Sequence, residues 1–251
     1  MNFQYTFKDP SSFIKMIELV KDLVDIMNFQ FHNDRIEFQS MDSAHVSLSM
    51  AKFDQECFSK IENYRYAQRG IHLKSLFLCL KCVKQGDELS ISSFDNKEIH
   101  INIKKKNNEM YTFQLNGVLM DDDGGLAIPD DVKYDCEFLM NANDFSDIIK
   151  NMSSFSGNVT FSNKQKLLDV SCKDIHGSLC FSKVFPKGNI ETIRNVSASF
   201  SNRYLQTFTK GNDIAQEVKV SFSDEQPMCL RYGFLKNSEV RFYLAPKIPE
   251  D

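Results

Sequence analysis

The sequence predicts an α+β protein built from two similar domains, each mostly β-strand with two helices. A strand–turn–strand pattern recurs at an offset of about 130 residues, and amphipathic helical segments recur near the same offset. Short runs rich in β-branched and aromatic residues, such as "ELSISSF" and "EVKVSF", lie between the helical segments. With 251 residues, 42% of them hydrophobic, the chain is long enough for two domains with separate cores.

The clearest repeat pairs "IEFQSMDSAHVSLSM" from Ile36 with "LLDVSCKDIHGSLCF" from Leu167. Both segments have the pattern of a strand, a polar turn containing Asp and His, and a second strand. Between the halves lies the acidic, glycine-containing stretch "LMDDDGGLAIPDDVKYD", which is typical of a crossover linker. We therefore expect domains at residues 1–118 and 136–251, joined by a connecting loop at 119–135.

Four helices are predicted, two in each half. The apolar spacing i, i+3, i+4, i+7 predicts helices over Pro10–Val24, His72–Lys84, Ala142–Ser153 and Asn202–Gly211. Asp9 followed by Pro10 is a helix start signal, and Gly211 is a helix stop signal.

The positive charge of the chain is concentrated on these helices. The whole chain carries a net charge of −4, but the four helices hold eight basic and four acidic residues, so the remainder carries −8. Exposure of charged helix faces to solvent is the ordinary explanation of this charge distribution. If all four faces lay on one surface, they would instead form a surface that binds nucleic-acid phosphates independently of sequence. The basic residues are Lys15, Lys21, Lys74, Lys81, Lys84, Lys150, Arg203 and Lys210.

No motif indicates a catalytic, metal or cofactor site. Cys79 and Cys82 form a C-x-x-C without a second ligand pair, so core packing explains them better than zinc. The acidic run at 121–123 lacks the spacing of an EF-hand loop and is explained as solvated linker. Asp42 and His45 share a short turn, where an Asx-type turn explains the aspartate. A small hydrolase using this pair remains an alternative from another functional class.

Targeting signals and membrane spans are also missing from the sequence pattern. The N-terminus lacks the basic start and apolar core of a signal peptide, and no apolar run approaches the roughly 20 residues of a membrane helix. The seven scattered cysteines are then expected to be reduced thiols. These features predict a soluble intracellular protein, cytosolic or nuclear.

Five segments together carry a family resemblance. "FQSMDSAHVSL" from Phe38, "LKC" from Leu80, "LMD" from Leu119, "IP" at Ile128 and "FYLAPKI" from Phe242 resemble the sliding-clamp family, specifically its proliferating cell nuclear antigen branch of eukaryotic-type DNA polymerase processivity factors. The resemblance implies the DNA-clamp fold, with antiparallel sheets outside and four helices inside, assembled as a homotrimeric, pseudo-sixfold ring around duplex DNA. It also implies a protein without enzymatic activity, located in the nucleus or at a viral replication site.

The resemblance further implies partners: DNA polymerase, clamp loader, flap endonuclease and DNA ligase, recruited by peptides with a glutamine and aromatic residues. A related clamp in damage signalling, or a monomeric or heteromeric viral processivity factor, is the alternative. The docking positions carried over are Met41, His45, Val46, Leu48, Leu126, Ile128, Pro129, Pro227, Tyr243, Ala245, Pro246 and Ile248.

Carrying the family's DNA-lining positions over gives Lys15, Lys21, Lys81, Lys150, Arg203 and Lys210. Uncharged or acidic residues stand where the family usually has a base, at Ile14, Leu78 and Asp147, and we expect Lys74 and Lys84 to compensate. The subunit contacts are expected at Met110–Gly117 and Gly177–Lys183, and Lys164 lies near the family's ubiquitin-accepting lysine.

Overall fold

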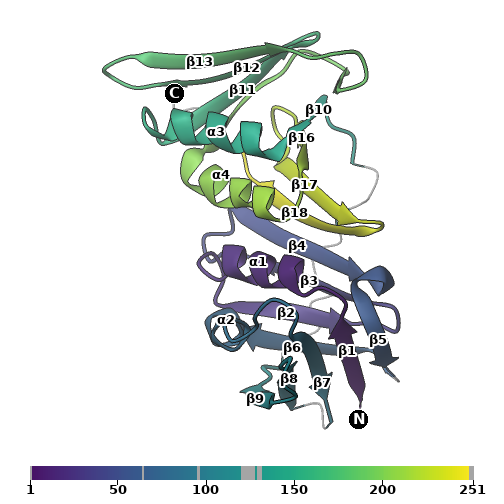
Figure 1. Ribbon diagram of the computed structural model, residues 1–251. Helices are drawn as coiled ribbons and strands as arrows, with labels where there is room; N and C mark the ends of the chain where they lie inside the picture. The colour runs from purple at the N-terminus through teal and green to yellow at the C-terminus, as the bar shows by residue number, and fades with distance from the viewer. Residues whose placement is uncertain (1, 64, 95–96, 120–127, 129–131, 249–251) are drawn as a thin grey trace. The chain divides into compact units, whose positions relative to one another are not determined.

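The computed structural model describes residues 2–63, 65–94, 97–119, 128 and 132–248 (Figure 1). The chain divides into two compact units. The first comprises Met1–Ser43, Ser49–Leu126 and Phe234–Val240, and the second comprises Ala44–Leu48, Ala127–Gly233 and Arg241–Asp251. The expected domain limits at 118 and 136 stay predictions, because most of the connection at 119–135 lies outside the described residues.

The first unit contains two groups of strands and two helices. An antiparallel sheet has the order β5 (Phe58–Asn63), β1 (Phe3–Phe7), β7 (Glu88–Ser93), β8 (Glu98–Lys104) and β9 (Met110–Asn116). The other group has the order β6 (Ala67–His72), β2 (Ile26–Phe31), β3 (Arg35–Met41) and β4 (Ser47–Asp54), the last preceding the short helix η1 (Gln55–Cys57). Helices α1 (Ser11–Val20) and α2 (Leu73–Leu80) pack against each other.

The second unit repeats this composition. One antiparallel sheet has the order β13 (Ser178–Val184), β12 (Leu167–Lys173), β11 (Asn158–Lys164) and β15 (Ser197–Ser201). A further group has the order β14 (Ile190–Thr192), β10 (Cys136–Asn141), β16 (Glu217–Phe222), β17 (Met228–Leu235) and β18 (Ser238–Leu244), although Phe234–Val240 of the last two strands belongs to the first unit. Helix α3 (Ala142–Ser153) packs against α4 (Asn202–Phe208) and the 3₁₀ helix η2 (Thr209–Asp213). The prediction of two mostly-β halves with two α-helices each is confirmed.

Phenylalanine fills the core of each unit. Strand β2 alternates buried and half-buried residues, so Phe29 and Phe31 point to one face, and the ring of Phe31 stacks on Phe3 at 4.1 Å. In the second unit, the rings of Phe208 and Phe242 stack at 4.6 Å and join α4 to β18. Close aromatic pairs of this kind add stability beyond their buried area.

Three of the four helices are shorter than the sequence predicts. Helix α3 matches Ala142–Ser153, and the side chain of Asn141 caps it by accepting hydrogen bonds from the amides of Asn143 and Asp144. Helices α1 and α2 instead end before Lys21 and Lys81, which occupy their C-cap positions.

The predicted range Asn202–Gly211 is wrong at its end, because α4 stops at Phe208 and η2 follows. The role of Gly211 also differs from the predicted helix stop. A Cβ at this position would lie 2.6 Å from the ring of Tyr232, which is fully buried. Gly211 therefore permits close approach of η2 to β17.

No helix in the described part of the chain is long and apolar enough to cross a membrane.

Candidate DNA interface and peptide-docking site

The basic residues of the first unit lie on the outer sides of α1 and α2. Lys15, Lys74 and Lys81 are exposed, opposite the buried residues Phe13 and Leu76 of the same helices. Lys84 lies beyond α2, where its amide donates a hydrogen bond to the side chain of Asp87, so its predicted position on the helix is wrong.

Two of these lysines share one aromatic ring. The Nζ atoms of Lys21 and Lys81 each lie 5.0 Å from the ring centroid of Phe77. Lys21 also forms an ion pair with Asp22 at 2.7 Å, and its side chain is only 19% exposed. Lys21 and Lys81 are thus brought together, although they come from different helices.

In the second unit, Lys150 lies on α3, Arg203 on α4 and Lys210 on η2, and all three are exposed. The side-chain amide of Asn212 donates a hydrogen bond to Asn143 over 3.0 Å, which ties η2 to the start of α3. The structure therefore brings the basic residues of each repeat to a pair of packed helices.

The positions that depart from the family pattern are exposed as well. Leu78 is 65% exposed on α2 and Asp147 is exposed on α3, whereas Ile14 is half-buried. Lys74, expected to compensate, forms an ion pair with Asp25 at 3.1 Å, which offsets part of its charge. Lys74 is therefore already paired with a carboxylate, and its compensating role stays a prediction.

The turn that precedes β4 carries the first group of predicted docking residues. His45 is exposed and has a left-handed backbone, with φ of 55°. The carbonyl of Val46 accepts a hydrogen bond from the amide of Ala245 over 2.9 Å. This bond brings the "QSMDSAHVSL" turn and the "YLAPKI" tail together within the second unit.

The other docking residues differ in their exposure. Leu48 and Tyr243 are buried, and burial raises the pKa of the Tyr243 phenol to about 12. Pro227 is exposed, and Ile248 is 88% exposed and available to a partner. Half-buried positions are Met41 (in the first unit), Val46, Ile128, Ala245 and Pro246. Leu126 and Pro129 lie outside the described residues.

The carboxylate of the hydrolase alternative is poorly accessible. Asp42 is only 6% exposed, whereas His45 is exposed at the tip of its turn. Among the described residues, no group of three or more His, Cys, Asp or Glu side chains is arranged to hold a metal ion.

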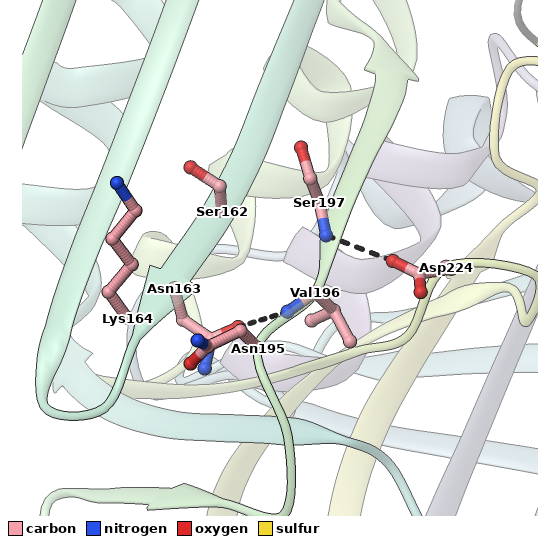
Figure 2. Close-up of a pocket in the computed structure, with 7 residues that line it drawn as sticks. All are labelled: Ser162, Asn163, Lys164, Asn195, Val196, Ser197 and Asp224. Atoms are coloured by element: carbon pink, nitrogen blue, oxygen red, sulfur yellow. Dashed lines mark hydrogen bonds between the residues drawn. The ribbon is translucent and has the colours of Figure 1, made fainter.

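A pocket beside Lys164 was not predicted from the sequence pattern. It has a volume of about 510 Å³ and lies between the end of β11 and the segment before β15. Figure 2 shows Asn163 bonded to the amide of Val196 and Asp224 bonded to the amide of Ser197, with Lys164 at the opposite end of the group. Lys164 is exposed where β11 turns into β12.

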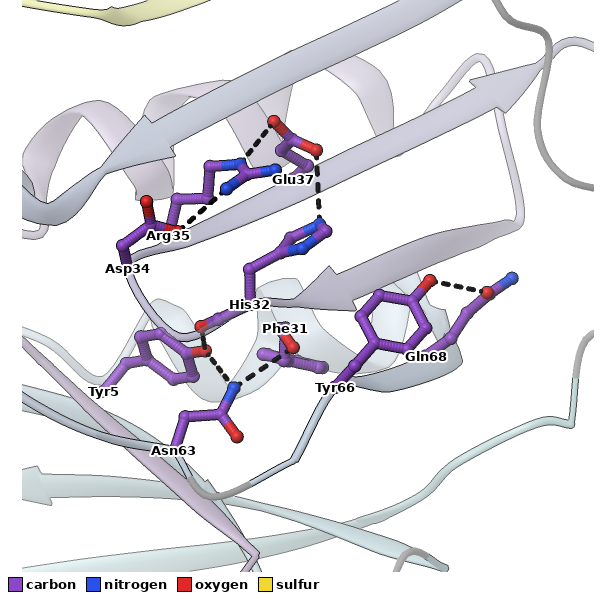
Figure 3. Close-up of polar contacts among 9 residues, drawn as sticks. All are labelled: Tyr5, Phe31, His32, Asp34, Arg35, Glu37, Asn63, Tyr66 and Gln68. Atoms are coloured by element: carbon purple, nitrogen blue, oxygen red, sulfur yellow. Dashed lines mark hydrogen bonds and ion pairs between the residues drawn. The ribbon is translucent and has the colours of Figure 1, made fainter.

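A polar cluster around His32 was also missed, because its members come from separate parts of the chain. His32 Nε2 lies 3.2 Å from Glu37 Oε2, and Arg35 binds the other carboxylate oxygen at 2.8 Å (Figure 3). The carbonyl of His32 accepts a hydrogen bond from Tyr5. Burial, and then the charge of Arg35, lower the pKa of His32 below its usual value.

Both segments expected to mediate subunit contacts are edge strands. Strand β9 ends the five-stranded sheet of the first unit, and β13 ends the four-stranded sheet of the second. Met110 and Val184 are 61% and 69% exposed. Unpaired edges of this kind are sites for pairing with another chain.

Comparisons with known proteins agree with this geometry. The family models of the N-terminal and C-terminal domains of proliferating cell nuclear antigen match residues 2–125 and 127–248. The chain is 30% identical to proliferating cell nuclear antigen 2 of Drosophila melanogaster, over 93% of both chains. It is 31% identical to proliferating cell nuclear antigen of Chaetomium thermophilum, over 94% of this chain and 95% of the relative.

The fold has a close counterpart among solved structures. A crystal structure of proliferating cellular nuclear antigen from Entamoeba histolytica superposes with a TM-score of 0.88 at 24% identity, covering 98% of this chain and 99% of the other. The chain is a DNA sliding clamp, a processivity factor for DNA synthesis. It belongs to the proliferating cell nuclear antigen family. Because this family consists of non-enzymatic clamps, the hydrolase alternative is wrong.

Proposed function

We propose that three copies of this chain close into a homotrimeric ring whose helices face duplex DNA. The observation that carries the proposal is the exposure of basic side chains on the helix pair of each unit, with Lys15, Lys81, Lys150, Arg203 and Lys210 all accessible. A positive lining on a chain of net charge −4 favours DNA at the helices and disfavours it elsewhere. Binding to phosphates alone allows sliding, because phosphates carry no sequence information.

The ring is closed by head-to-tail pairing of β9 in one copy with β13 in the next. Support comes from the positions of β9 and β13 at edges of their sheets, one in each unit, which such pairing covers. Sedimentation at micromolar concentration is expected to give about three times the mass of the 29.0 kDa chain. A mass near one chain would contradict the homotrimer.

The decisive experiment tests whether the protein encircles DNA, by comparing circular with linear duplex. The clamp is loaded onto a circular duplex, the circle is cut once, and the protein retained on DNA is measured before and after cutting. A ring is expected to slide off the free ends, so retention falls after cutting. Unchanged retention would show that direct binding, and not encirclement, holds the protein on DNA.

The turn–tail hydrogen bond of Val46 and Ala245 supports a docking site for partner peptides. The site combines apolar side chains with backbone groups, which suits extended peptides carrying a glutamine and aromatic residues. The proposal also includes Met41, Leu126, Ile128 and Pro129, which are carried over from the family resemblance. DNA polymerase, clamp loader, flap endonuclease and DNA ligase are the proposed partners.

Binding of a synthetic peptide with a glutamine and two aromatic residues, measured by calorimetry, tests this part. His45→Ala and Leu126→Ala are expected to weaken it, and a peptide without its aromatic residues is the control. Undiminished binding by both variants would contradict the docking site.

Location and modification complete the proposal. The protein acts in the nucleus or at a viral replication site, where polymerase and duplex DNA are present. Lys164 is the proposed ubiquitin acceptor, because it lies near the lysine that carries this role in the family; its exposure at the turn after β11 supports this role. Mass spectrometry of the modified protein, with Lys164→Arg as the control, tests the assignment; modification that persists in the variant would contradict it.

A further inference from the structure

The ends of α1 and α2 converge on a single phenylalanine. Lys21 is the C-cap residue of α1 and Lys81 is the C-cap residue of α2. Because each Nζ atom lies 5.0 Å from the centroid of the Phe77 ring, the two ammonium groups are no more than about 10 Å apart. A lysine is also favoured at the C-terminal end of a helix, where the helix dipole is negative.

The packing of the two helices fixes this arrangement. The amide of Leu73, the first residue of α2, donates a hydrogen bond to the carbonyl of Asp25, just beyond α1, over 2.9 Å. Phe77 follows one turn later and is 7% exposed, so its ring is held between the helices and not free in solvent. The ring therefore offers a fixed point that both lysines reach.

An aromatic ring restrains a cation differently from a carboxylate. Asp22 lies 2.7 Å from Lys21, and its negative charge offsets that of the lysine. The Phe77 ring attracts an ammonium group through its quadrupole but carries no net charge. It limits the motion of both lysines without adding a counter-charge, so less conformational entropy is lost when DNA binds.

We propose that Phe77 is a positioning residue for DNA binding, which holds Lys21 and Lys81 as one pre-organised pair of cations for neighbouring phosphates of a single strand. Phosphates of one strand recur every 3.4 Å along the duplex axis, so a pair within about 10 Å suits neighbouring groups. This inference rests on the proposed placement of the helices against DNA.

The second repeat lacks the arrangement. Counting from the first residues of α2 and α4, Gln206 occupies the place of Phe77, and Lys210 that of Lys81. Helix α3 is capped at its C-terminal end by Ser154 and not by a lysine. Among the described residues of α3, α4 and η2, none places a lysine over an aromatic ring. The paired cations are thus a property of the first unit alone.

The test measures binding of a fluorescent duplex to the intact oligomer by anisotropy at low salt. Phe77→Leu is expected to weaken binding about two- to fivefold, whereas Phe77→Tyr keeps the ring and binds as the native protein does. Gln206→Leu is the matched control on α4 and is expected to have no effect. In a Lys21→Met, Lys81→Met background, Phe77→Leu is expected to cause no further loss.

Folding is monitored by melting temperature and oligomer mass. If Phe77→Leu lowers either, Phe77→Met, which fills a similar volume with a flexible side chain, takes its place. An equal loss with and without the two lysines would overturn the role of Phe77. The role of Phe77 would also be overturned if Phe77→Leu bound duplex normally while the Lys21→Met, Lys81→Met variant bound it more weakly. If that double-lysine variant binds duplex normally, the placement of these helices against DNA fails first, and the role of Phe77 with it.

Discussion

The amide of Ala245 donates a hydrogen bond to the carbonyl of Val46 over 2.9 Å, joining the C-terminal tail to the turn before β4. The two residues are far apart in sequence but belong to the same unit. The bond fixes the tail against the turn, where we place the peptide-docking site.

Removing this bond is expected to weaken peptide docking. Ala245→Pro deletes the N–H donor, and a net loss of about 1 kcal/mol corresponds to roughly fivefold weaker binding in calorimetry. Ala245→Gly keeps the donor and is the control. Equal affinities for the proline variant and the native protein would show that docking does not depend on the tail position.

Loss of basic side chains is expected to weaken DNA association without affecting docking. With Lys81→Ala and Lys210→Ala combined, the slope of log K against log[salt] should become shallower by about 0.9 for each phosphate that is no longer neutralised. The measurement is duplex binding across a salt series, with peptide affinity as the control. Parallel loss of duplex and peptide binding would indicate a damaged fold.

A gain of DNA affinity is expected from Leu78→Lys. Leu78 is 65% exposed on α2, so the substitution costs little apolar burial and adds a cation to the proposed lining. Duplex binding should strengthen and its salt slope should steepen by up to about 0.9 for each additional phosphate that is neutralised. Leu78→Gln, polar but uncharged, is the matched control. If it strengthens binding equally, added charge is not the cause.

Gly211→Ala is expected to destabilise the second unit by about 1–3 kcal/mol, because the new Cβ would lie 2.6 Å from the buried ring of Tyr232. Gly157→Ala is the control, since a Cβ there meets nothing within 4 Å and no positive φ opposes it. Urea unfolding measures both variants. Equal stability of the two would contradict the close approach of η2 to β17.

Stability is expected to fall in mild acid through His32. Its folded-state pKa is lowered by burial and by Arg35, so the unfolded chain binds the proton more readily. The contribution of neutral His32 to the free energy of unfolding is fully present above a pH of about 6.5. It is lost as the pH falls from there toward the folded-state pKa.

Unfolding curves between pH 5 and 8 measure this contribution, and His32→Gln, which cannot be protonated, is the reference variant. The native protein should lose stability relative to this variant as the pH falls. Parallel pH profiles would contradict the assignment to His32.

Local patterns in the sequence predicted the existence of the helices better than the positions of their ends. Helix α3 keeps its predicted bounds because Asn141 caps it locally. Helix α2 ends earlier than predicted: beyond Leu80 the amides of Cys82 and Val83 bond to carbonyls three residues back, and the amide of Lys84 bonds to Asp87. The predicted length followed apolar spacing, which does not register such turns.

Interactions between distant segments were beyond any local pattern. The basic side chains were found from the sequence, but the shared ring of Phe77 depends on how α1 packs on α2. The docking residues were proposed only through resemblance, since neither the Val46 turn nor the Ala245 tail has a distinctive chemistry of its own. The His32 cluster left no sequence signal, because each of its residues is ordinary in isolation.

The edge positions of β9 and β13 affect whether assembly stops at a fixed number of subunits. Because β9 and β13 are different strands, each copy offers two unlike edges, and pairing them does not by itself end at three subunits. Whether growth stops depends on the rotation between successive copies. If the copies pair as proposed, a surface substitution that alters this rotation would give fibres in place of closed rings, even with the fold and the lining residues unchanged.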